Sequence, residues 1–205
     1  MTFAPQLPAD WDRVQARGIS VGDARYDLTL ERAMGRATIK VERRIQVNVA
    51  GAAGVIVAPA FPLDARIRSV AVNGNAVKFD TQRMGDVQRI EVNVNPEAPI
   101  SEIVFTYDEG TDVYVERESL RPGAGNEGLR VLSSHAEANA LRLRLEGLGG
   151  RTYELRMRTQ RRVGEASGVK VGRAAGSADQ QLSITFDGPQ GTYVRREVIV
   201  PMLAR

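Results

Sequence analysis

Apolar and polar residues alternate along most of this chain, a pattern typical of strands with one buried and one solvent-facing side. The alternation is clearest in 141–159, "LRLRLEGLGGRTYELRMRT", and in 182–200, "LSITFDGPQGTYVRREVIV". In each segment two alternating runs flank glycines in the form apolar-x-apolar-acid-Gly-x-x-Gly. The two segments therefore have one local structure in common, and what the glycines do decides what that structure is.

Two β-hairpins are the interpretation that this alternation favours. Keeping the apolar faces together places Leu145 opposite Tyr153 and Phe186 opposite Val194, with loops over 147–151 and 188–192. Glycines at the two positions that the loops share supply the positive φ values that short connections require. A phosphate-binding loop would need a helix after it, and no helical pattern follows either loop. The same alternation turns Tyr153 toward the core and Tyr193 toward solvent.

The rest of the chain also reads as short strands separated by turn signals. Met34-Gly35 and Asn73-Gly74 are predicted hairpin turns, and "GVIVAP", "ISEIVFTYDEG", "DVYVERE" and "GVKVGRA" are predicted strands. No amphipathic helix longer than a turn or two is found. We therefore predict an all-β fold, an antiparallel β-sandwich of two packed layers or subdomains. The expected organisation is a leader (1–16), a first half (17–118), a Gly/Pro loop (119–129) and a second half (130–205).

Composition narrows the class of protein only moderately. The 205 residues are 42% hydrophobic and 26% charged, with a net charge of +3 and no cysteine, so disulfide and thiolate chemistry is excluded. The arginines alternate singly along strands and aromatic residues make up 5%, which argues against nucleic-acid binding. No apolar run reaches the roughly 20 residues that span a bilayer, and no signal peptide is recognised. The compartment stays open.

Candidate chemistry is limited to one acidic cluster and one histidine. The acidic residues Asp108, Glu109, Asp112, Glu116 and Glu118 could ligate calcium, with the first three as the candidates, or provide the two carboxylates of a glycoside hydrolase. The alternative is an acidic surface loop that offsets the arginines. His135 has no partner histidines for a metal site and no identifiable neighbours for a catalytic role. No catalytic residue and no cofactor is assigned.

The leader carries the most specific motif. "FAPQLPADWDRV" (3–14) has the form F-x-P-x-L-P-x-x-W-x-x-[VL], and it is followed by "YDLTLER" and by a P-x-F-P…V-x-V-N-G element at 59–74. These features resemble the C-terminal β-sandwich of bacterial (α/α)6-barrel glycoside hydrolases and disaccharide phosphorylases of the maltose phosphorylase type. The resemblance covers roughly the first 80 residues. It implies an accessory domain that packs against a catalytic helical barrel, where the family's catalytic acids lie.

That resemblance and its rivals predict different surface residues. An excised accessory domain, with Met1 added for expression, should expose its former interface, for which the candidates are Phe3, Leu7, Trp11 and Phe61. An independent carbohydrate-binding module would instead stack sugars on exposed aromatic residues, with Trp11, Tyr107, Tyr114 and Tyr193 as candidates. A small standalone hydrolase using the acidic loop is the third alternative.

Overall fold

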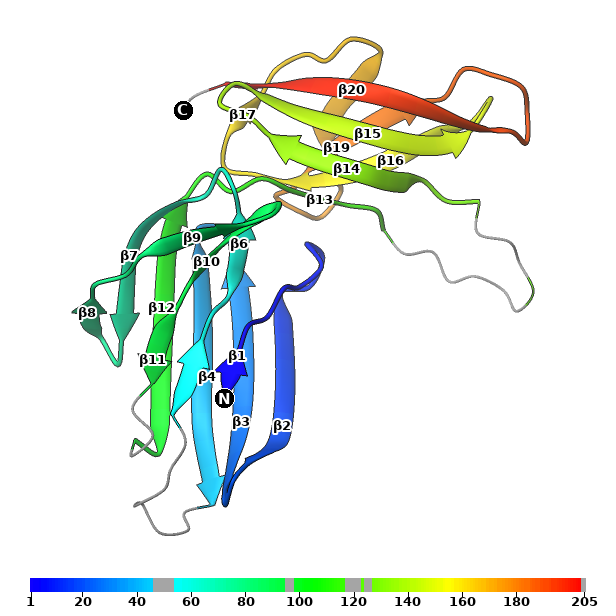
Figure 1. Ribbon diagram of the computed structural model, residues 1–205. Helices are drawn as coiled ribbons and strands as arrows, with labels where there is room; N and C mark the ends of the chain where they lie inside the picture. Colours follow the sequence, from blue (N-terminus) through cyan, green and yellow to red (C-terminus); the bar gives the residue numbers. More distant parts are fainter. Residues whose placement is uncertain (46–53, 95–97, 117–122, 124–126, 204–205) are drawn as a thin grey trace. The chain divides into compact units, whose positions relative to one another are not determined.

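The computed structural model describes residues 1–45, 54–94, 98–116, 123 and 127–203, and every regular element among them is a β-strand (Figure 1). The chain divides into two compact units, Met1–Gly110 and Thr111–Arg205, each with its own hydrophobic core. All strand pairs that the structure describes are antiparallel except β1 with β5. The predicted all-β, antiparallel sandwich architecture is thus confirmed. The described residues include no helix that could cross a membrane.

The first unit is a sandwich whose larger layer is a six-stranded sheet. Its strand order is β2 (Arg13–Val21), β3 (Ala24–Ala33), β4 (Arg36–Ile45), β12 (Ile100–Asp108), β7 (Arg66–Val72) and β8 (Asn75–Val77). Two three-stranded sheets form the other layer: β1 (Thr2–Phe3), β5 (Val55–Val57) and β11 (Val92–Val94), and β6 (Ala60–Pro62), β10 (Val87–Ile90) and β9 (Thr81–Met84). Alternate residues of both layers fill one core, in which Leu28, Ile39 and Phe105 are at most 1% exposed.

Both hairpin turns predicted in this unit are confirmed. Ala33 pairs with Arg36 across Met34-Gly35, and Val72 pairs with Asn75 across Asn73-Gly74. Asn73 and Gly74 have φ values of 50° and 81°, the two successive positive φ angles of a type I′ turn. The turn matches the right-handed twist of the flanking strands, so its sequence specifies it locally.

A β-bulge in β2 is held by a carboxylate from the neighbouring strand. The register of β2 shifts between Ala16 and Ile19, and Gly18 within the bulge has a φ of 67°. The Gly18 N–H donates to Oδ1 of Asp27 at 2.8 Å, and Arg44 Nε donates to Oδ2 at 2.8 Å. The Gly18 hydrogen bond, followed by the contact with Arg44, lowers the pKa of Asp27 below its ordinary value of 3.8. Asp27 therefore has to stay ionised for the bulge to be fully bonded.

Acidification is expected to destabilise the first unit through Asp27. Because its pKa is lower in the folded state, the stabilisation is complete above the unfolded value, roughly pH 4, and is lost as the pH falls through the folded value. We expect the urea midpoint of the first unit, followed by fluorescence of the sole tryptophan, to fall less steeply with acid in Asp27→Asn than in the wild type. Identical acid profiles for the two proteins would contradict this assignment.

The second unit is a sandwich of two four-stranded sheets. One has the order β14 (Arg130–Ala136), β15 (Ala140–Leu148), β20 (Tyr193–Leu203) and β17 (Arg162–Val163). The other has the order β13 (Asp112–Tyr114), β16 (Thr152–Arg158), β19 (Gln180–Thr185) and β18 (Val169–Arg173). The alternating apolar residues of segments 141–159 and 182–200 fill the core between the two sheets. The fully buried ones are Leu141, Leu143, Leu145, Leu155, Met157, Leu182, Ile184 and Phe186.

The prediction of two hairpins in this unit is wrong. β15 pairs with β14 and β20, whereas β16 pairs with β13 and β19, so Leu145 is not the strand partner of Tyr153. β19 and β20 likewise lie in different sheets, so Phe186 does not pair with Val194. Both glycine-containing connections are arches that carry the chain from one sheet to the other. Alternation cannot separate the two cases, because an arch and a hairpin both keep the apolar faces of their strands toward the core.

The two arches bond to each other. Gly149 N–H donates to Thr192 O at 2.9 Å, Gly150 N–H donates to Phe186 O at 2.7 Å, and Phe186 N–H donates to Arg151 O at 2.9 Å. Gly188 has a φ of 147°, a backbone region that is nearly restricted to glycine. The glycines are therefore required by backbone packing at one end of the sandwich, where the two chain segments cross.

The boundaries expected from the sequence also change. β13 pairs with β16 of the second unit, so the division falls after Gly110 and not within 119–129, most of which lies outside the described residues. The expected leader (1–16) is not a separate segment either. Thr2–Phe3 adds to β5 as a parallel strand, and Arg13 already opens β2. Backbone pairing, which sequence composition does not report, determines both boundaries.

Candidate functional site

A turn in the leader presents the chain's sole tryptophan at the surface. The N–H of Trp11 donates to Pro8 O at 3.1 Å, which closes a turn over Pro8–Trp11. Ala9 inside this turn is 8% exposed, whereas the Trp11 side chain is among the exposed large apolar groups at 41%. We call residues 8–11 the tryptophan turn. It combines a buried anchor with an exposed aromatic side chain, an arrangement suited to contact with another surface.

A side chain of the adjacent strand β3 holds this turn. Arg32 donates from Nη2 to Pro8 O at 2.6 Å, and from Nη2 and Nε to Trp11 O at 2.9 and 3.1 Å. Its own N–H donates to Asp12 O at 2.7 Å. Sequence reasoning missed Arg32, a single arginine beside Glu31 near the end of a predicted strand, although its position continues the apolar face of Leu28 and Leu30. Only the contact between β3 and the leader identifies it.

The other interface candidates contribute to the first core. Phe61 is 4% exposed in β6, and its ring lies 5.5 Å from that of Phe105. Phe3 and Leu7 are half-buried and pack against the same core. Phe3 and Phe61 lie in strands β1 and β6 and not in irregular segments. Of the four candidates, Trp11 alone is an exposed side chain.

The four aromatic candidates for sugar stacking do not form one platform. Trp11 and Tyr107 belong to the first unit, and Tyr114 and Tyr193 belong to different sheets of the second. Tyr107 is half-buried, with its ring 5.4 Å from Phe61 in an edge-on arrangement. Tyr193 faces outward at 36% exposure, as alternation predicts, and the Arg130 guanidinium lies 4.2 Å from its ring centroid. Each aromatic ring thus has its own local surroundings.

Tyr114 has a polar role within the second sandwich. Its hydroxyl donates to Oδ2 of Asp179 at 2.6 Å, and Asp179, 3% exposed, also pairs with Arg158 at 3.4 Å. Burial and the hydrogen bond to this carboxylate raise the pKa of Tyr114 to about 12. The arrangement satisfies a buried carboxylate and connects β13 to the segment preceding β19.

The acidic cluster is a set of ion pairs. Arg68 Nε pairs with Asp108 Oδ2, and Arg66 Nη2 lies 3.1 Å from Glu109 Oε1. Both arginines belong to β7, which begins at Arg66. β7 pairs with β12, whose last residue is Asp108, and Glu109 follows directly after it. Opposite charges on adjacent strands stabilise the pairing of β12 with β7 modestly.

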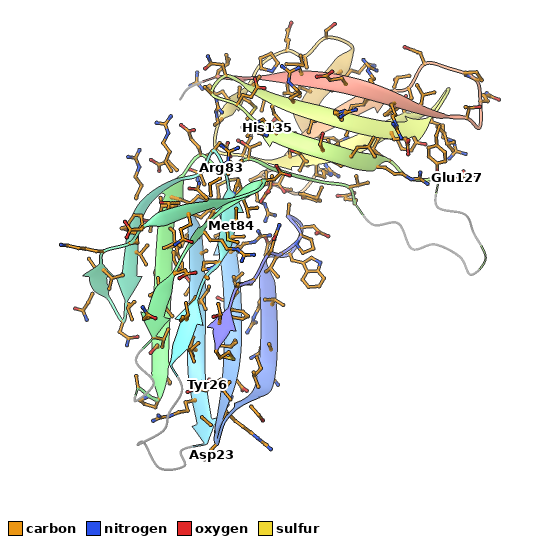
Figure 2. All side chains as sticks on the ribbon, in the orientation of Figure 1. Asp23, Tyr26, Arg83, Met84, Glu127 and His135 are labelled. Carbon is orange, nitrogen blue, oxygen red and sulfur yellow. The ribbon has the colours of Figure 1, made fainter. Side chains whose placement is uncertain are left out.

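The remaining acids of the cluster lie in the second unit. Asp112 opens β13, and Glu116 Oε1 accepts from Arg156 Nη2 at 2.9 Å; Glu118 lies outside the described residues. No group of three or more histidine, aspartate or glutamate side chains able to hold a metal ion occurs among the residues that the structure describes. The acids that looked like one cluster in sequence are divided between two units. His135 is exposed on β14, opposite Arg142 (Figure 2).

Comparison with known proteins adds no relative to this description. No protein-family model, curated protein or solved structure gives a significant match to the chain.

Proposed function

We propose that this chain is a non-catalytic accessory region of a larger bacterial carbohydrate-active enzyme, a glycoside hydrolase or disaccharide phosphorylase. In this proposal its first unit packs against an (α/α)6-barrel catalytic domain of the same polypeptide, which also carries the active site. The observation that carries the proposal is the tryptophan turn, in which Trp11 is 41% exposed on a segment that is otherwise anchored in the core.

Anchoring and exposure in the leader support a docking role. Phe3 and Leu7 pack into the first core, so the segment lies against the sandwich up to the turn. Trp11 then leaves a large aromatic surface in water, at 41% exposure. Tryptophan is enriched among the residues that dominate protein interfaces, because burying its ring contributes much of the binding energy. The same segment resembles the barrel-to-sandwich leader of the enzymes named above.

The acids support an accessory role as well. Asp108 and Glu109 are each held by an arginine of β7, and Glu116 by Arg156. A glycosidase needs two carboxylates that face each other across the scissile bond, whereas the structure places an arginine against each of these acids. The arrangement favours surface ion pairs over the hydrolase alternative.

The size of the native polypeptide tests the proposal first. An antibody raised against this chain should detect, in an extract of the source cells, a polypeptide far larger than 22.4 kDa. Peptides from that band should include a long helical sequence. A native polypeptide of 22.4 kDa would overturn the proposal. Binding of oligosaccharides by Trp11 or Tyr193 would then be the function to measure.

A substitution in that larger enzyme tests the docking surface itself. Trp11→Ala should make the junction between barrel and sandwich sensitive to limited proteolysis, under conditions in which the wild type resists cleavage. Met84→Ala is the matched control, because Met84 is also exposed, at 50%, on the edge strand β9 of the same unit. Equal cleavage of the wild type and Trp11→Ala would show that the tryptophan turn is not the docking surface.

A further inference from the structure

We infer that Arg32 is a positioning residue, which fixes the backbone of the tryptophan turn so that the Trp11 ring is presented in one orientation before its partner binds. This inference rests on the proposed docking function, and it adds the residue on which the docking geometry depends. It concerns β3 and the leader within the first unit alone.

The guanidinium bridges the two ends of the turn. Pro8 O, at its start, accepts from Arg32 Nη2 at 2.6 Å and from the N–H of Trp11 at 3.1 Å. Trp11 O, at its end, accepts from Nη2 and Nε of the same side chain at 2.9 and 3.1 Å. Arginine suits this role because its planar group carries donors in a rigid fork and keeps its charge at any physiological pH. The carbonyls of Pro8 and of Trp11 itself are thereby held by one side chain.

The backbone on both sides of the turn is fixed as well. Asp12 O accepts from the N–H of Arg32 at 2.7 Å, and Arg13 then pairs with Glu31 in the sheet. On the other side, Leu7 packs against the first core. The backbone that carries Trp11 is therefore held before any partner binds. Less ordering entropy is then lost on binding, which is the physical advantage of a preorganised contact residue.

Fluorescence of the sole tryptophan reports this site without interference from other tryptophans. The experiment measures time-resolved anisotropy and acrylamide quenching on the 205-residue chain, comparing wild type with Arg32→Ala and Arg32→Lys. Arg25→Ala is the matched control, because Arg25 is an exposed arginine of the same strand. Far-UV circular dichroism and the urea midpoint are recorded for every variant, so that a local change is separated from unfolding.

In Arg32→Ala we expect the slow component of the anisotropy decay to lose amplitude, because Trp11 gains sub-nanosecond motion. We also expect acrylamide to quench the fluorescence of Trp11 more strongly. Arg32→Lys should fall between wild type and Arg32→Ala, because an ammonium is a point charge and lacks the fork that reaches both carbonyls. Arg25→Ala should match the wild type.

Two results would overturn the inference. One is unchanged anisotropy in Arg32→Ala. The other is an anisotropy change that appears only together with loss of the circular dichroism signal, which would make Arg32 a general fold residue. The measurement needs no catalytic domain, so its outcome is independent of the size of the native polypeptide. A failed docking proposal and a failed positioning role are therefore distinguished.

Discussion

Gly149→Ala is expected to destabilise the second unit by about 3 kcal/mol, the upper part of the range for steric insertion into a packed site. A Cβ at Gly149 would overlap the carbonyl oxygen of Pro189 and lie 2.8 Å from the carbonyl carbon and oxygen of Gly188. These are backbone atoms of the other arch, bonded to Gly149 through Thr192 O, so they cannot move aside as a flexible side chain would. The two arches have to separate instead.

Hydrogen exchange measured by mass spectrometry checks this expectation, with the paired strands β15 and β20 as the readout. Gly172→Ala is the matched control, because Gly172 lies in β18 of the same unit and a Cβ there would meet nothing within 4 Å. We expect its stability to stay within about 0.5 kcal/mol of the wild type. If amide exchange in β15 and β20 were as slow in Gly149→Ala as in Gly172→Ala, the description of two interlocked arches would be wrong.

Phe105→Ala is expected to destabilise the first unit by about 3–5 kcal/mol, the usual cost of deleting a buried phenylalanine. Phe105 is 0% exposed on the central strand β12, and its ring packs 5.5 Å from that of Phe61 in the opposite layer. Truncation leaves a cavity between two sheets. Hydrogen bonds between neighbouring strands hold each sheet in shape, so the sheets cannot close over the cavity. Because Trp11 belongs to this unit, its fluorescence transition in urea should move to lower concentration.

The matched control for Phe105→Ala is Ile100→Ala in the same strand, because Ile100 is 46% exposed. We expect this variant to shift the Trp11 transition far less. Since each unit has its own core, Phe105→Ala should leave exchange in β15 and β20 unchanged, and Gly149→Ala should leave the Trp11 transition unchanged. Loss of both signals in either variant would contradict the division into two separately stabilised units.

Only part of the candidate site could be predicted from the sequence, and Trp11, Phe61 and Arg32 show why. Trp11 was identified because a lone tryptophan in a proline-rich segment stands out in any sequence. Phe61 was misassigned as a surface residue, since a short apolar motif between prolines does not show that β6 covers the six-stranded sheet. Arg32 carried only a weak signal, as a charged residue that continues the apolar face of Leu28 and Leu30. Its role depends on two backbone carbonyls about twenty residues away, and no local pattern reports such a contact.

The amino-acid sequence by itself determined the strand content, the buried face of each strand and the turns at Met34-Gly35 and Asn73-Gly74. These depend on side-chain alternation and on local backbone preferences, which act over a few residues. Tertiary structure alone decided that β15–β16 and β19–β20 are arches, that the units divide at Gly110, and that Arg32 holds the tryptophan turn. The physical reason is that alternation specifies which side of a strand is buried and leaves its hydrogen-bonding partner open. That partner is chosen by packing between segments far apart in the chain.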